Sequence, residues 1–136
     1  DSNINFVYGG LTAAETAANP VRDNLNTVSF KPLNSAYPNA IGITFYWYSR
    51  ANKQIVEADT VFNSDLPWSI NSYGAVFNGS YDLRNIATHE FGHWLVLGDL
   101  YSGRDAELTM YGYGAMGETK KDTLGRGDIS GIQKAY

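Results

Sequence analysis

The only two histidines of the chain lie four residues apart, in the run His89-Glu90-Phe91-Gly92-His93. Residues four apart share one face of an α-helix, so both imidazoles can reach a single metal ion. Glu90 lies one position after His89, where it can flank the ion without binding it and act as general base toward a metal-bound water. The run therefore predicts a catalytic metal site on a helix.

The same five residues are also compatible with two histidines that are exposed, or hydrogen-bonded in a core. The surrounding residues favour the metal site, because Phe91, Trp94 and Leu95 supply the apolar surface that a buried active-site helix needs. Gly92 costs up to ~1 kcal/mol relative to alanine in a helix interior. We therefore expect another backbone segment to pack closely against the helix at this point.

The composition restricts the third ligand. The chain has 136 residues, no cysteine and no further histidine, which excludes disulfides, thiol catalysis, iron–sulfur clusters and thiolate zinc sites. A catalytic zinc site has three protein ligands and one open position, so the third ligand must be a carboxylate. Asp99 is the candidate, six residues after His93. Gly98 is expected to adopt the left-handed conformation that ends the helix and returns the chain to the ion.

Charge and hydropathy exclude other classes of function. The net charge is -4, which argues against a nucleic-acid partner bound through phosphates. No apolar run approaches the roughly 18 residues of a membrane span.

The length predicts one domain over residues 1–136, and we expect a monomer. Sparse charge, abundant uncharged polar residues and the absence of a leader predict the mature form of a secreted protein.

The elements that must position these residues follow from periodicity and from helix signals. We expect an α+β domain, with strands first and helices in the second half. The predicted strands are 4–8, 28–33, 41–48 and 55–62. The first predicted helix covers 12–25 and is interrupted at Asn19-Pro20. The second covers 83–97 and is capped by Asp82, and the third covers 129–135 and is capped by Asp128. Residues 63–80 read as a long loop with room for one short strand near 75–77, and residues 100–125 as irregular.

The extended motif resembles that of the metzincin zinc peptidases, and within them the matrixins. Residues 89–99 match His-Glu-x-x-His-x-x-Gly-x-x-His/Asp at all three ligand positions, with Asp99 third. Leu108-Thr109-Met110-Tyr111 is similar to the Met-turn of the family, residues 124–136 to its C-terminal helix, and Glu57-Ala58-Asp59-Thr60-Val61-Phe62 to its edge strand.

The resemblance implies a twisted, mostly parallel sheet of about five strands with an antiparallel edge strand, an active-site helix, a Met-turn and a C-terminal helix. An upper subdomain would cover about 1–98 and a lower one about 99–136. The implied activity is a zinc-dependent endopeptidase with one catalytic Zn²⁺ and Glu90 as general base toward a metal-activated water. Met110 would lie beneath the zinc.

The resemblance also implies how a substrate would bind. A peptide would lie extended along the edge strand around Val56 to Val61. Residues 111–117 would line the pocket for the residue after the cleaved bond, with Tyr111 in that wall and Tyr113 directed toward the oxyanion.

Three features depart from the family pattern. Val96 occupies the position of the family's glycine, where a positive φ is unfavourable for a β-branched residue. Either the helix runs on and turns at Gly98, or Val96 is strained, or the site is damaged. Only Asp128 remains of the acidic pair before the last helix, where it is expected to tie that helix to the Met-turn. No histidines are left for a second zinc. Ca²⁺ bound by Asp and backbone carbonyls stays compatible with the sequence, although no loop has the spacing of a calcium site.

Two alternatives stay open. The chain would be a non-catalytic, zinc-containing peptide-binding module if Val96 marks a decayed site, although the retained Glu90 argues against this. It would be a plain structural domain if the histidines are incidental.

Overall fold

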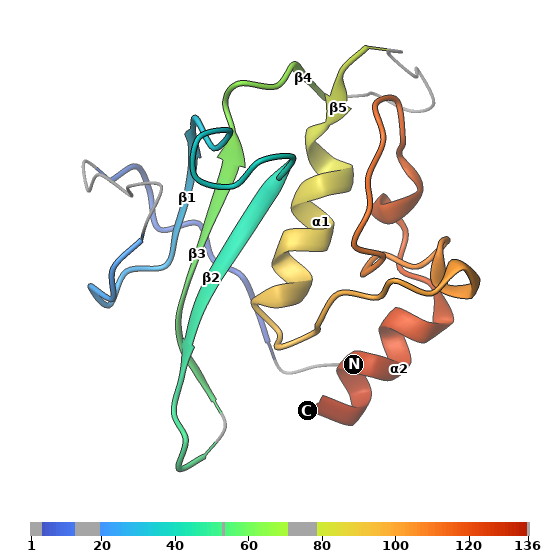
Figure 1. Cartoon of the computed structure of the whole chain (residues 1–136). Helices are drawn as coiled ribbons and strands as arrows, with labels where there is room; N and C mark the ends of the chain where they lie inside the picture. Colours follow the sequence, from blue (N-terminus) through green and yellow to red (C-terminus); the bar gives the residue numbers. More distant parts are fainter. Residues whose placement is uncertain (1–3, 13–19, 53, 71–78, 136) are drawn as a thin grey trace.

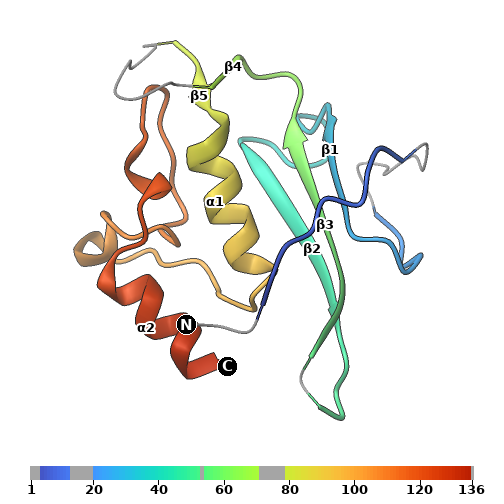
Figure 2. The same cartoon turned by 180° about the vertical axis from the view of Figure 1, so that it is seen from behind.

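The computed structural model describes residues 4–12, 20–52, 54–70 and 79–135. The elements in chain order are β1 (Thr27–Lys31), β2 (Gly42–Tyr48), β3 (Ile55–Asn63), β4 (Trp68–Ser69), β5 (Tyr81–Asp82), α1 (Leu83–His93), the 3₁₀ turns η1 (Gly103–Asp105) and η2 (Lys120–Asp122), and α2 (Arg126–Ala135). The helix α1 lies between the sheet on one side and the irregular segment that precedes α2 on the other (Figures 1 and 2).

The main sheet has the order β1-β3-β2. β1 pairs with β3 in parallel, and β2 pairs with β3 antiparallel. β3 is buried continuously from Glu57 to Asn63, as expected for a strand with neighbours on both sides. β2 is therefore the antiparallel edge strand among the described residues, and α1 packs against it.

A second, short ladder positions the start of the active-site helix. β4 pairs in parallel with β5, with Trp68 opposite Tyr81 and Ser69 opposite Asp82. β5 runs directly into α1, whose first turn is capped by the Asp82 side chain. The ring of Trp68 lies at 5.5 Å from that of Phe62 on β3, so aromatic packing connects this ladder to the main sheet.

The described residues contain the mixed arrangement of helices and strands that the sequence predicted, with the α-helices α1 and α2. In place of the expected sheet of about five strands, they form a three-stranded sheet and a separate two-stranded ladder. The resemblance was wrong in making 56–61 an edge, because β3 is the central strand. The short strand considered near 75–77 lies outside the described residues.

The N-terminal predictions were also wrong where they can be compared. Residues 4–8 are not a strand, and residues 20–25 are not helical. Pro20 disfavours a continuous helix, and the backbone N–H of Asp23 donates to the Glu57 carboxylate at 2.9 Å instead of to a helical carbonyl. Buried Glu57 thus ties this segment to β3. Residues 13–19 of the predicted helix lie outside the described residues.

Among the described residues, no helix has both the length and the apolarity needed to cross a membrane.

Candidate metal and catalytic site

The helix α1 presents both histidines on one face. Its first turn is fixed by Asp82, which accepts the backbone N–H of Asn85 at 2.8 Å, a favourable N-cap. Asp99 Oδ1 lies 3.1 Å from His89 Nε2 and 3.6 Å from His93 Nε2. The three potential ligand atoms all lie within 4.8 Å of one another, so the structure brings together the three ligands expected from the sequence.

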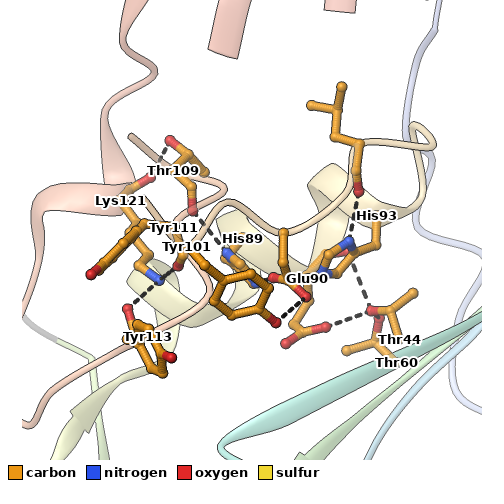
Figure 3. A network of polar contacts seen from close by, with 12 residues as sticks. Thr44, Thr60, His89, Glu90, His93, Tyr101, Thr109, Tyr111, Tyr113 and Lys121 are labelled. Atoms are coloured by element: carbon orange, nitrogen blue, oxygen red, sulfur yellow. Dashed lines mark hydrogen bonds and ion pairs between the residues drawn. The ribbon is translucent and has the colours of Figure 1, made fainter. Parts of the chain in front are cut away.

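Each histidine is oriented by a backbone carbonyl. His89 Nδ1 contacts the Thr109 carbonyl at 2.8 Å, and His93 Nδ1 contacts the Leu97 carbonyl at 2.7 Å (Figure 3). Because a carbonyl oxygen can only accept, each Nδ1 must carry the proton. Each Nε2 of a neutral ring then directs a lone pair toward the common point, as metal-binding histidines do.

Asp99 also has an orienting partner, which the sequence analysis missed. The Tyr101 hydroxyl donates to Asp99 Oδ2 at 3.2 Å, while Asp99 Oδ1 faces the histidines. The negative charge of Asp99 raises the pKa of the Tyr101 phenol. The carboxylate can therefore offer one oxygen to a metal while the other accepts from a hydroxyl. The one feature of the sequence that could have indicated this contact is the position of Tyr101 two residues after Asp99.

The turn after α1 is made by Val96 and not by Gly98. The helix ends at His93, Val96 has a φ of 64°, and the φ of Gly98 lies outside the left-handed region. Two hydrogen bonds close the turn: Leu97 N–H to the Gly92 carbonyl at 3.1 Å, and Val96 N–H to the His93 carbonyl at 3.0 Å.

This pair of bonds is a Schellman motif, which normally has glycine at the left-handed position. The predicted helix end at Leu97 and the predicted left-handed Gly98 are therefore wrong, and Val96 is the strained residue. The strain has a local use, because the same turn places the Leu97 carbonyl against His93 Nδ1.

Glu90 is buried, with 4% of its surface exposed, on the side of α1 that faces β2. The Thr44 hydroxyl on β2 donates to Glu90 Oε2 at 2.7 Å. The Thr44 and Thr60 hydroxyl oxygens lie 2.7 Å apart, within hydrogen-bond distance (Figure 3). Gly42 leaves the room that the carboxylate needs, since a Cβ there would lie 2.8 Å from Glu90 Oε1. Glu90 therefore has a fixed position beside the histidines.

Burial shifts the pKa values of both central groups away from their charged forms. It raises the pKa of Glu90, against the opposing hydrogen bond from Thr44. It lowers the pKa of His89 to about 4, against the opposing contact with the Thr109 carbonyl. His89 is consequently neutral at pH 7, which is the form that binds a metal.

These groups line one open cavity of about 500 Å³. One wall is the β2 edge with the loop before it, residues 39–44 and Tyr46. The floor is α1 with His89, Glu90 and His93, and the far wall is formed by Tyr101, residues 112–114 and Lys121. A ligand in this cavity would contact the potential metal ligands and the edge strand together.

The donor set fits zinc. Two imidazole nitrogens and one carboxylate oxygen, with the cavity on the open side, correspond to the three protein ligands of a catalytic zinc site. Calcium and magnesium prefer sets made of oxygen alone. Three lone-pair donors that converge without a cation would repel one another, so the oriented arrangement is better suited to holding an ion than to standing alone.

The comparison with protein families bears on this arrangement. The family model described as Matrixin matches residues 44–136, which is more than half of the chain and contains β3, α1, Asp99 and α2. The chain belongs to the matrixin family. A search of curated proteins finds no match to this chain.

In this matrixin the predicted Met-turn residues form a turn, closed by the Tyr111 N–H to the Leu108 carbonyl at 3.1 Å. Met110 is buried with 3% of its surface exposed. Its sulfur packs against Gly92, where an added Cβ would overlap it. The close packing expected at Gly92 is therefore present, but a methionine side chain supplies it and not a backbone segment.

Asp128 ties α2 to the same turn. Its Oδ2 accepts the Thr109 N–H at 3.1 Å and the Gly125 N–H at 2.8 Å. α2 begins at Arg126, so Asp128 is its third residue, and the predicted N-cap at this position is wrong. The carboxylate instead reaches back to the N–H before the helix, as the acidic residue of a capping box does.

Of the two tyrosines expected at the pocket, Tyr113 lines the cavity, whereas Tyr111 does not. The Tyr113 ring packs edge-on against the rings of Tyr101 and Tyr111, each at 5.5 Å, and 61% of its surface is exposed. Backbone carbonyls of Tyr111 and Tyr113 accept from the Lys121 ammonium. Tyr101 is the tyrosine whose hydroxyl contacts a potential ligand in this matrixin, and neither Tyr101, Thr44 nor Lys121 was singled out from the sequence.

Proposed function

We propose that the chain is a zinc-dependent endopeptidase, in which His89, His93 and Asp99 hold the ion and Glu90 is the general base. The observation that carries this proposal is the three-residue donor set with its orienting partners, next to a buried carboxylate in an open cavity. Zinc, when bound, supplies a Lewis acid that polarises the scissile carbonyl and stabilises negative charge on its oxygen.

Glu90 would move the protons. Its carboxylate is buried beside the histidines, and burial raises its pKa toward the working pH, where a general base is most effective. It would take a proton from the attacking water and pass it to the leaving amine. The hydrogen bond from Thr44 holds one oxygen, Oε2, in place, so the other oxygen is the one available for this transfer.

A peptide substrate would lie along β2. This strand is the sheet edge that borders the cavity, and residues 41–44 line it directly. An extended peptide can add to such an edge by main-chain hydrogen bonds, while its side chains enter pockets. The edge strand proposed for the substrate thus moves from residues 56–61 to residues 42–48.

A non-catalytic peptide-binding module is the second candidate, and the strained Val96 is the observation that raised it. The Leu97 carbonyl nevertheless holds His93 Nδ1 in its orientation, and Glu90 keeps its place. These contacts support catalysis over decay.

The test compares the wild type with Glu90→Gln, each loaded with one equivalent of zinc. We expect equal zinc content, hydrolysis of an unfolded protein substrate by the wild type, and a loss of hydrolysis of at least a hundredfold in Glu90→Gln, the range of general-base catalysis. Asp122→Asn, a partner of Arg84 outside the cavity lining, is the control. Equal rates in wild type and Glu90→Gln would refute the assignment, and zinc binding without hydrolysis would favour the second candidate.

A further inference from the structure

Lys121 is a buried cation in the wall of the catalytic cavity. It lies in η2, only 2% of its surface is exposed, and it lines the same cavity as His89 and Glu90. Its backbone is fixed on two sides: the Lys121 N–H donates to the Asn85 side chain on α1 at 2.7 Å, and its carbonyl accepts the Thr109 hydroxyl at 3.2 Å. The side chain is thus held at the cavity by both α1 and the turn before Met110.

The ammonium contacts backbone carbonyls and not carboxylates. It donates to the Tyr111 carbonyl and to the Tyr113 carbonyl, the latter at 2.8 Å (Figure 3). Within the described residues no carboxylate oxygen lies within 4.0 Å of it, whereas the neighbouring Lys120 pairs with Glu107 and Glu118. An ammonium has three N–H donors, and two are used by the carbonyls.

A buried cation without an ionic partner is costly, because it loses hydration that only a counter-charge restores in full. Burial lowers the pKa of Lys121, against the opposing charges of Glu118, Asp99 and Glu90, which lie beyond contact distance. The cavity lining includes Gly112, Gly114 and Ile86, besides the polar side chains of Tyr101, Tyr113 and His89. A carboxylate that entered beside this wall would find the third donor of the ammonium in a partly dehydrated place, where a charge-assisted hydrogen bond is strongest.

We propose that Lys121 makes the cavity select peptides that carry a carboxylate side chain, Asp or Glu, beside the bond to be cleaved. The inference rests on the proposed endopeptidase function and adds the substrate class. It follows from the position of Lys121: the ammonium borders the same cavity as the histidines and Glu90, so the side chains it meets belong to residues adjacent to the reacting bond.

The experiment first maps the cleavage sites in a random peptide mixture by mass spectrometry, with zinc-loaded wild type. Matched peptides then carry Glu or the isosteric Gln at each of the two positions that flank the cut. We expect kcat/KM to favour Glu at one of these positions by roughly tenfold to a hundredfold, the range of a charge-assisted hydrogen bond. The preference should vanish in Lys121→Met, and Lys120→Met, which removes a neighbouring charge outside the cavity lining, should keep it.

A second readout separates this inference from the proposed function and does not require turnover. Fluorescence anisotropy measures binding of the same Glu and Gln peptides to zinc-loaded Glu90→Gln, with and without Lys121→Met. Hydrolysis without a preference for Glu over Gln overturns the role of Lys121 and leaves the endopeptidase standing. If binding prefers Glu and depends on Lys121 but the wild type hydrolyses no peptide, the role of Lys121 stands and the endopeptidase function is overturned. If Lys121→Met does not fold, the wild-type preference still decides, because its absence overturns the inference.

Discussion

The left-handed Val96 allows a prediction whose sign distinguishes two backbone paths. In the structure Val96 has a φ of 64° and Gly98 does not lie in the left-handed region. A Cβ at a left-handed residue costs roughly 1–2 kcal/mol. At ordinary positions alanine is more stabilising than glycine by about 0.4–1 kcal/mol, because glycine has more freedom in the unfolded chain.

The comparison of Val96→Gly with Val96→Ala isolates the cost of the Cβ, since both variants lose the rest of the valine side chain. Subtracting the glycine entropy from the left-handed cost gives a net advantage of Val96→Gly over Val96→Ala of about 0.5–1 kcal/mol. Gly98→Ala should show the opposite preference and stabilise by about 0.4–1 kcal/mol, since a Cβ there meets no atom within 4 Å.

Guanidinium unfolding of the metal-free variants measures these differences, provided the variants share one m-value. Zinc affinity should stay within a few-fold of wild type in Val96→Gly, because the Leu97 carbonyl that orients His93 comes from the backbone. If Val96→Ala is more stable than Val96→Gly, and Gly98→Ala is destabilised, the turn lies at Gly98 and the structural reasoning fails.

Three further predictions concern the same helix. Gly92→Ala should destabilise the metal-free protein by about 1 kcal/mol or more in denaturant unfolding, because its Cβ overlaps the buried Met110 sulfur; unchanged stability would contradict this packing. Thr44→Val removes a hydrogen bond that lowers the pKa of Glu90, so that pKa should rise in a ¹³C NMR titration of the metal-free protein, and a fall would exclude the contact. Folding lowers the pKa of His89 from 6.5 to about 4, so between these pH values the unfolded state binds more protons than the folded state. The metal-free protein should therefore lose up to about 3 kcal/mol of stability as the pH falls from 6.5 to 4. His89→Gln should lose less over that range, whereas an equal loss would show that His89 is not buried in the neutral form.

The local features of the site were predictable where the interaction is local in sequence. The spacing of His89 and His93 fixes their shared helix face, and Asp82 caps that helix as its type and position indicate. The strands β1, β2 and β3 follow from runs of β-branched and aromatic residues, because such runs fit a buried sheet.

The features that could not be predicted depend on contacts between residues far apart in the sequence. A strand lies at the edge of a sheet or inside it according to the strands that pair with it. β3 pairs with β1 on one side and with β2 on the other, although its residues resemble those of an edge strand. The turn was expected at Gly98, with a strained Val96 as an alternative, because local preference favours glycine. In the structure the carbonyls of His93 and Gly92 accept the hydrogen bonds that hold the turn at Val96. Tyr101 and Lys121 become part of the site only when the segments that carry them fold back onto α1.

The coordination of zinc, measured by X-ray absorption at the zinc edge on protein loaded at neutral pH, tests the central claim most directly. The account predicts one zinc per chain with two imidazole nitrogens and two oxygens, one oxygen from Asp99 and one from solvent, and the loss of one oxygen or of stoichiometric binding in Asp99→Ala. Zinc that binds with less than one equivalent per chain, or with an unchanged shell in Asp99→Ala, would contradict it.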